Sequence, residues 1–326
     1  MKTPSLRFAA AGLAACIATV FSGTGNAQTY PVRAVRAISV SGPGGAGDAM
    51  QRLVLDRLGQ ALGQNAVIDY RPGANGILAA ELASKATADG YTLFISNVGA
   101  IAVNAALYRK LPYDPQRDFT PLTLATTSPL FLIANLNVPA NSVKELIALA
   151  KAKPDTLTIG YPGSGGMLAG YMFLQMAGVN ILQVPYKTVP GTMTDLISGQ
   201  IQLYFAATSN AVPQIKAGRI KTYGVTTEAR AAILPDVPTL SEAGLAGFNS
   251  DFWFGFFVPA GTPPEIASRL NREIVAILKQ PEMREKIAAM GDIVIASTPE
   301  AFADKIARDI ARYRQVVQDA KIPLQD

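Results

Sequence analysis

The residues best suited to chemistry are a glycine-rich run that ends in an acid, Ser41-Gly42-Pro43-Gly44-Gly45-Ala46-Gly47-Asp48. An apolar run over 35–40 predicts a strand before it, and apolar residues at a period near 3.6 predict a helix after it. Backbone N–H groups at a helix N-terminus have no partner within the helix, and the helix dipole is positive there. Because glycine lets another molecule approach these groups, the loop predicts a seat for a carboxylate or phosphate. The candidate ligand contacts are Ser41, Gly42, Gly44, Gly45 and Gly47.

Two other interpretations of this loop stay open. The loop is either a plain strand-to-helix turn in which Asp48 caps the helix, or the G-x-G-x-x-G turn of a dinucleotide site. In the second case Gly42, Gly44 and Gly47 would contact the cofactor, and Asp69 would stand near the ribose. The chain would then be an NAD-dependent oxidoreductase. Asp69 also fits a polar residue that ends a strand over 66–69.

A second glycine loop, Pro162-Gly163-Ser164-Gly165-Gly166, repeats the device between a strand expected over 157–161 and a helix that carries Met167. Ser164 lacks the first glycine of a nucleophile elbow, and the chain has no histidine to take its proton. A Ser164–Lys187 pair is the remaining arrangement for a nucleophile. Ser96 and Asn97 end another expected strand, where α/β sheets bind ligands, although both could instead cap the next helix.

The chain has no histidine, and Cys16 is its single cysteine. Histidine or cysteine nucleophiles, zinc sites with nitrogen and sulfur ligands, and haem attachment are therefore excluded once Cys16 is removed. We expect no metal and no redox cofactor. We also expect ligand affinity to be nearly flat between pH 5 and 8, because no unperturbed side chain other than histidine titrates there.

The N-terminus predicts export. Lys2 and Arg7 precede an apolar stretch over 8–21, and small residues end at Ala27, so residues 1–27 fit a secretory signal peptide. The stretch is too short for a membrane span. Leu13-Ala14-Ala15-Cys16 forms an alternative lipoprotein box, which would anchor the chain through Cys16. Without the signal the chain keeps 27 basic and 24 acidic residues, dispersed along it, so nucleic acid is not an expected partner.

The order of expected elements predicts an α/β fold of two lobes. Strands and helices alternate through both halves, which favours mostly parallel sheets flanked by helices. A long strand over 122–135 would cross into the second lobe, and a strand over 220–225 would return. We therefore expect the first lobe over 28–124 and 224–326 and the second over 125–223. A glycine loop on each lobe suggests a cleft that closes by a hinge.

Several motifs, in a fixed order along the chain, resemble those of one known family. They are Tyr30-Pro31, Pro43-Gly44-Gly45 with Asp48, Arg71-Pro72-Gly73-Ala74 with Gly76, Asp89-Gly90-Tyr91-Thr92-Leu93, Leu111-Pro112-Tyr113-Asp114-Pro115, Val184-Pro185-Tyr186-Lys187, Leu234-Pro235-Asp236-Val237-Pro238-Thr239 and Pro259-Ala260-Gly261-Thr262-Pro263. They are similar to the Bug-type receptors, the extracytoplasmic substrate-binding proteins of tripartite tricarboxylate transporters.

This resemblance implies a two-lobed periplasmic-binding-protein fold, type II-like, with a ligand cleft between the lobes. It implies a periplasmic receptor, without enzymatic activity, that delivers a small carboxylated molecule to the permease subunits of a membrane transporter. From the absence of histidine, of cysteine after residue 16 and of any carboxylate cluster, we also expect a monomer. The family's grip, through backbone amides and one helix N-terminus per lobe, points to Ser41–Gly47 and Gly163–Met167. Further lining candidates are Ser96, Asn97, Tyr186 and Thr208. Lys187 is a rival partner for the anion.

The chain departs from the resembled pattern within the expected pocket. Ser41-Gly42 stands where the family often has Phe-Pro, Met167 where it often has histidine, and Thr188 where it often has glycine. These departures leave the expected fold unchanged and bear on which carboxylate is bound.

Overall fold

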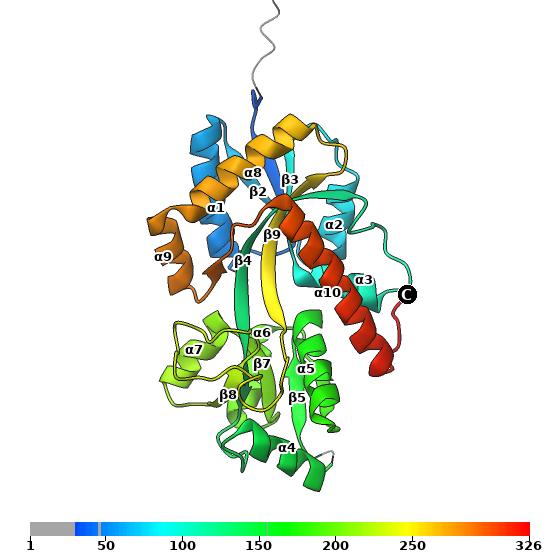
Figure 1. Ribbon diagram of the computed structural model, residues 1–326, viewed down its shortest axis with the longest axis vertical. Coiled ribbons are helices and arrows are strands. Elements are labelled where there is room, and N and C mark those ends of the chain that lie inside the picture. The colour runs from blue at the N-terminus through cyan, green and yellow to red at the C-terminus, as the bar shows by residue number, and fades with distance from the viewer. Residues whose placement is uncertain (1–29, 45–46, 155) are drawn as a thin grey trace, which may run out of the picture.

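The computed structural model describes residues 30–44, 47–154 and 156–326. The expected signal peptide over 1–27, with Cys16, and the candidate contact Gly45 lie outside these residues. Two lobes are joined by two long strands, β4 (Phe119–Ala134) and β9 (Asp251–Pro259), which run side by side through the first lobe to the junction, where β4 continues into the second lobe (Figure 1).

The first lobe fills the upper half of Figure 1. Its sheet has the strand order β2-β1-β3-β9-β4, with the short strand β10 (Ile293–Val294) paired to β4. The other strands of this lobe are β1 (Val35–Ser39), β2 (Ala66–Tyr70) and β3 (Thr92–Asn97). Its helices are α1 (Asp48–Leu62), η1 (Ala74–Gly76), α2 (Ile77–Ser84), η2 (Gly99–Val103), α3 (Asn104–Leu107), α8 (Pro264–Lys279) and α9 (Pro281–Ala289).

The second lobe continues the same sheet through β4, in the order β4-β7-β5-β6, with β8 also paired to β4. Its strands are β5 (Thr158–Tyr161), β6 (Leu182–Pro185), β7 (Leu203–Ala207) and β8 (Lys221–Val225). Its helices are α4 (Val143–Ala152), α5 (Ser164–Ala177), α6 (Val189–Ser198) and α7 (Thr208–Lys216). Each lobe thus repeats strands followed by helices, as the alternating pattern predicts.

The sheet is mixed, which differs from the mostly parallel sheets expected. The pairs β1–β2, β1–β3, β5–β6 and β5–β7 are parallel. The crossing strands β4 and β9 pair antiparallel with each other and with their neighbours, as β3–β9 and β4–β7 show. A strand that enters a lobe from its partner runs against the local βαβ units, so the joint itself introduces the antiparallel pairs.

The expectation that residues 220–225 return to the first lobe is wrong. β8 pairs antiparallel with Phe131–Ala134 of β4, and the following chain bridges back to β8 at Thr239. The backbone N–H of Ser250 then donates to Thr226 O at 2.9 Å, which holds the chain at the second lobe until β9 begins. The return strand is β9.

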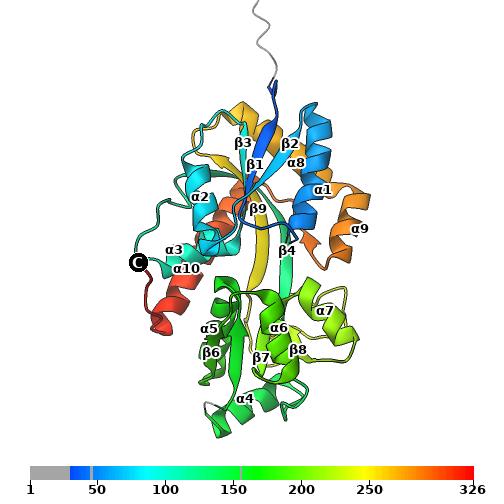
Figure 2. The same cartoon turned by 180° about the vertical axis from the view of Figure 1, so that it is seen from behind.

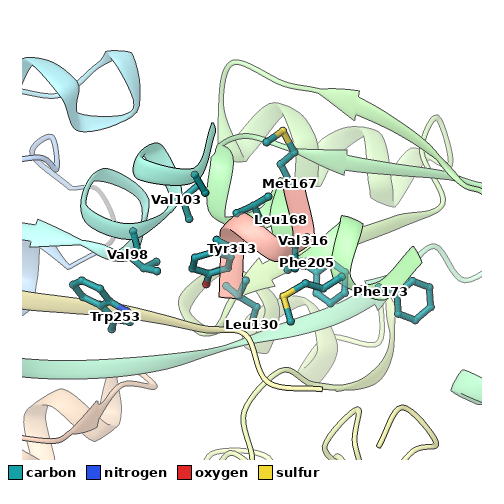
Figure 3. Packing of buried hydrophobic residues seen from close by; sticks show 14 of the residues in the cluster. Val98, Val103, Leu130, Met167, Leu168, Phe173, Phe205, Trp253, Tyr313 and Val316 are labelled. Carbon is teal, nitrogen blue, oxygen red and sulfur yellow. The ribbon is translucent and has the colours of Figure 1, made fainter. Parts of the chain in front are cut away.

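A third link between the lobes is the long helix α10 (Pro299–Asp319), which descends from the first lobe beside α5 (Figure 1). Figure 3 shows Tyr313 of α10 between Val98 of the first lobe and Leu168 of α5, with Val316 of α10 beside Phe205 of β7. These side chains belong to one buried cluster, so the apolar core continues across the lobe junction on this side. No helix in the described part of the chain is long and apolar enough to cross a membrane.

Candidate functional site

A cavity of about 430 Å³ lies between the lobes, and we call it the smaller cavity. The first lobe contributes Gly73–Gly76, Asn97 and Gly99 to its wall, and the second contributes Gly163, Gly165 and Gly166. The remaining lining residues are Val40, Leu130, Pro162, Val189, Tyr204, Phe205, Ala207, Asn210 and Phe252. None of these side chains is charged.

Helix N-termini surround the smaller cavity. Lining residues stand at the beginnings of α2, α5, α6 and α7, and the last three helices lie in the second lobe (Figure 2). The first N–H groups of each helix have no partner inside it, and the partial positive charge of the dipole is concentrated there. A neutral cavity with several such ends around it stabilises an anion without any cationic side chain.

The turn before α2 has a special backbone. Four consecutive residues, Gly73, Ala74, Asn75 and Gly76, have positive φ, from 45° at Ala74 to 113° at Gly73. The buried Asn104 donates from its Nδ2 to the carbonyl of Asn75 at 3.0 Å and so supports this turn from below. Left-handed backbone at non-glycine residues costs free energy, and such residues cluster at active sites, ligand clamps and switch regions.

A second cavity of about 660 Å³, the larger cavity, lies beside the first and shares Val189, Ala207, Asn210 and Phe252 with it. Its wall includes Gly44 and Gly47 before α1 and Thr208 at the beginning of α7. Asp292, on the turn between α9 and β10, is the one charged side chain among the described residues that line either cavity. The two glycine loops thus border adjacent cavities.

The first glycine loop contributes fewer contacts than expected. Gly44 and Gly47 line the larger cavity, whereas Ser41 and Gly42 line neither. Ser41 is buried beneath the loop, where its hydroxyl accepts from Gln51 Nε2 at 3.4 Å. Gly47 has φ of 79°, and a Cβ there would lie 2.5 Å from the Phe254 ring, so the close packing requires glycine.

Asp48 does not cap α1, because the N-cap residue is Gly47 and no side chain accepts there. Its Oδ2 instead accepts from the backbone N–H of Gly44 at 2.7 Å, and its Oδ1 accepts from the Tyr70 hydroxyl at 2.6 Å. Burial raises the pKa of Asp48, but these hydrogen bonds outweigh it and hold the pKa below its usual range. The Gly44 N–H is therefore already used within the loop.

The second glycine loop is where the sequence placed it. Gly163, Gly165 and Gly166 line the smaller cavity, and Ser164 begins α5. The side chain of Ser164 lies outside the described part of the structure. Met167 lines neither cavity and is buried in the core between the lobes, so its residue type serves packing rather than ligand contact (Figure 3).

The remaining candidates divide into three kinds. Asn97 lines the smaller cavity, and Thr208 lines the larger one while its hydroxyl donates to Pro129 O at 3.1 Å. Ser96 is fully buried on β3 and lines neither cavity. Tyr186 also lines neither cavity. Its hydroxyl donates to Asp195 Oδ2 at 2.7 Å. Desolvation first, and then this carboxylate, raise the pKa of Tyr186 to about 12. Lys187 is exposed and lines neither cavity.

Sequence reasoning missed Asn75, Asn210, Phe252 and Asp292. Asn75 lies inside a quoted motif, Arg71–Gly76, so its position before a helix was a usable signal. Phe252 sits where β9 crosses the junction and borders both cavities. Asp292 follows an ordinary helix end, and nothing in its local pattern points to a binding site.

The dinucleotide interpretation finds no support at Asp69. Its carboxylate is held by two guanidinium groups, Arg36 from β1 and Arg71 at 2.9 Å. Burial raises the pKa of Asp69, but the hydrogen bonds from Arg36 and Arg71 hold it below its usual range. Asp69 is therefore an ion-paired residue on β2, the edge strand of the sheet. Asp69 also lines neither inter-lobe cavity.

Two α/β lobes joined by crossing strands, with an uncharged cavity between them, define a periplasmic-binding-protein fold. Residues 50–322 match the family described as "Tripartite tricarboxylate transporter family receptor". The chain belongs to this family, whose members are extracytoplasmic substrate-binding receptors and not enzymes.

Two relatives match the sequence of this chain over most of their own length. A protein encoded in the TAR-I ttuE-ttuC' intergenic region of Agrobacterium vitis is 35% identical over 93% of this chain and 89% of its own. BugT of Bordetella pertussis is 32% identical over 90% of this chain and 91% of its own.

Solved structures show the same fold. R. palustris Rpa4515 with adipate has 35% sequence identity and a TM-score of 0.81, covering 90% of this chain and 99% of that chain. MatC (Rpa3494) from Rhodopseudomonas palustris with bound malate has 31% identity and a TM-score of 0.77, covering 88% of this chain and 100% of that chain.

Proposed function

We propose that this receptor captures a small carboxylated molecule between its lobes and hands it to the membrane permease of a tripartite transporter. One observation carries the proposal: the smaller cavity has no charged side chain and is bordered by the N-termini of α2, α5, α6 and α7. Such a site stabilises a carboxylate through backbone N–H groups and helix dipoles. The adipate and malate in the structures of two relatives support this ligand class.

The ligand contacts we propose are residues that line the smaller cavity near the helix N-termini, together with two asparagines. In the first lobe these are Gly73–Gly76 and Asn97, and in the second Gly163, Gly165, Gly166 and Asn210. Gly44, Gly47 and Thr208 would contact the part of the ligand that enters the larger cavity. Lys187, Tyr186 and Met167 line neither cavity and are not among the contacts we propose.

Closure would bend the two crossing strands. β4 and β9 carry the chain between the lobes, and the register of their pairing shifts at 121–123 and 124–126. Such irregularities weaken a ladder locally and suit a hinge. From the pairing of β8 and the contacts of 226–250, we propose the second lobe over 130–250 and the first over 30–129 and 251–326.

Export to the periplasm, by way of the signal peptide over 1–27, follows from the family's extracytoplasmic location and remains a proposal for this chain. We also propose that the receptor is a monomer, since a cleft between the lobes of one chain needs no second copy to be complete.

A thermal-shift titration tests the ligand class. The chain from Gln28 is heated with adipate, malate and succinate, with the corresponding diamides, and with NAD. Ligand at about 100 times its dissociation constant stabilises the folded state by roughly 2.7 kcal/mol, so binding raises the melting temperature measurably. We expect at least one acid to raise it and no diamide to do so. Stabilisation by NAD and by none of the acids would overturn the proposal.

A further inference from the structure

Asp292 places a carboxylate inside the larger cavity. Its Oδ1 accepts a hydrogen bond from the Ser128 hydroxyl of β4, so the acid is held between an α9–β10 turn and a crossing strand. The preceding Gly291 has φ of 86°, and a Cβ there would lie 2.0 Å from Thr208 Cγ2. This close approach brings the turn of the first lobe against the beginning of α7, at the inter-lobe junction.

Among the described residues, the carboxylate of Asp292 has few polar partners. Ser128 is the one described side chain that donates to it, and no described lysine or arginine forms an ion pair with it. Desolvation raises its pKa to about 6, with the Ser128 hydrogen bond acting in the other direction. A half-buried carboxylate with one described donor gains most from a cation or a strong donor that enters the cavity.

The two cavities differ in charge. The smaller cavity is uncharged and bordered by helix N-termini, whereas the larger one already contains the negative charge of Asp292 above its pKa. The dipoles of α1 and α7 also face the larger cavity, but Asp292 supplies the anion that they favour. A second carboxylate of a ligand would meet a like charge there, and an ammonium group would meet an opposite one.

We propose that Asp292 makes this receptor select carboxylates that carry an ammonium group at their far end. The ligand's carboxylate would occupy the smaller cavity, and its ammonium group would donate to Asp292 past Phe252 and Asn210, which border both cavities. This inference rests on the proposed function and adds the ligand class, an amino carboxylate in preference to a dicarboxylate.

Two matched ligand pairs test it by calorimetry above pH 7. 4-Aminobutanoate is compared with glutarate, and 5-aminopentanoate with adipate, because each pair differs only in an ammonium or carboxylate at one end. We expect the wild-type receptor to bind at least one amino carboxylate about ten-fold or more tightly than its dicarboxylate. Asp292→Asn should remove this preference by weakening the amino carboxylate, while the dicarboxylate binds as well or better.

Asp304→Asn makes the same chemical change at an exposed position of α10 and should leave both affinities unchanged. A wild-type receptor that prefers the dicarboxylates, with the same preference in Asp292→Asn, would overturn the inference and leave the receptor function intact. So would binding of other carboxylates but of neither pair. If no carboxylate binds to the folded chain, the proposed function and the inference both fall.

Discussion

Asp292 gives the receptor a pH dependence that its composition does not predict. The pKa of Asp292 is raised from 3.8 to about 6 in the folded protein. The folded state therefore binds this proton more tightly than the unfolded chain, so the contribution of Asp292 to stability falls as the pH rises from about 4 to about 6. Above that window the charged, desolvated carboxylate destabilises the fold by on the order of 2–3 kcal/mol.

Asp292→Asn should remove this cost, since an amide oxygen can still accept from Ser128. We therefore compare the free energy of unfolding of the variant with that of the wild-type chain at each pH. The difference in favour of the variant should be on the order of 2 kcal/mol larger at pH 7 than at pH 4. Urea unfolding of both proteins at the two pH values measures the difference. An equal difference at pH 4 and pH 7 would show that Asp292 titrates normally. The flat pH profile expected from the absence of histidine holds only for unperturbed side chains.

Lys187 should matter little to ligand affinity, because it is exposed and lines neither cavity. Lys187→Ala is expected to change the binding free energy by less than about 1 kcal/mol, the range of exposed charge contacts. Lys144→Ala, at another exposed lysine of the same lobe, measures the general effect of one lost positive charge. A loss above roughly 2 kcal/mol in Lys187→Ala alone would identify the lysine as a direct partner of the anion.

Among single residues, the sequence predicted those whose role depends on the backbone alone. A glycine loop between a strand and a helix must expose N–H groups, and Gly163, Gly165 and Gly166 line the cavity accordingly. Side-chain roles depend on which segments meet. Ser96 and Tyr186 stand beside the expected positions, yet one faces the core and the other an acid of its own lobe. Asp292 reaches the cavity only through a turn 244 residues beyond the end of the first loop at Asp48, and no local pattern predicts this.

The N-terminus of α5 is the element we expect to bind the carboxylate in the second lobe. A Cβ at Gly165 would lie 3.6 Å from the Phe252 ring, an ordinary contact, so Gly165→Ala should keep the fold. Gly165→Val adds bulk at the wall of the smaller cavity and should weaken carboxylate binding by about ten-fold or more. Calorimetry gives the affinities, and the melting temperature confirms folding. Unchanged affinity in a folded Gly165→Val would remove α5 from the site.

Helices with a strong apolar periodicity were predicted well. The place of a strand in the sheet was predicted poorly, because it depends on which strand pairs with it. The helix predicted after the first glycine loop is α1 (Asp48–Leu62), and the helix predicted to carry Met167 is α5 (Ser164–Ala177). The strand over 221–225 was also recognised, but its partner was not. An apolar run shows that a strand is buried and does not show which strand lies beside it. The choice between β8 and β9 as the return strand was therefore beyond the sequence.

At the scale of the whole molecule, a polar network ties α10 to β9, one of the two crossing strands. Trp253 Nε1 of β9 donates to Asp309 Oδ2 at 2.8 Å, and Arg312 donates to Asp309 Oδ1 at 2.8 Å. Lys305 lies 3.1 Å from Asp251 at the start of β9 and 3.2 Å from Asp309. The network is largely buried and stands where the strands cross between the lobes.

Removing the central acid of this network should destabilise the fold. Asp309→Ala leaves the Trp253 N–H and two cations without their shared partner, and we expect a loss of about 3 kcal/mol in the free energy of unfolding. Asp304→Ala, at an exposed acid of the same helix, should change it by less than about 0.5 kcal/mol. Urea unfolding compares them. Equal stabilities for the two variants would mean that α10 is held by its apolar contacts alone.

The central claim is that a carboxylate is held between the lobes by helix N-termini. A crystal structure of the chain with the tightest-binding acid of the thermal-shift panel tests it directly. We predict a ligand carboxylate in the smaller cavity that accepts hydrogen bonds of about 2.7–3.2 Å from backbone N–H groups at the start of α5 and from the first lobe. A carboxylate paired instead with Lys187 or an arginine, or bound outside the cavity, would contradict the account.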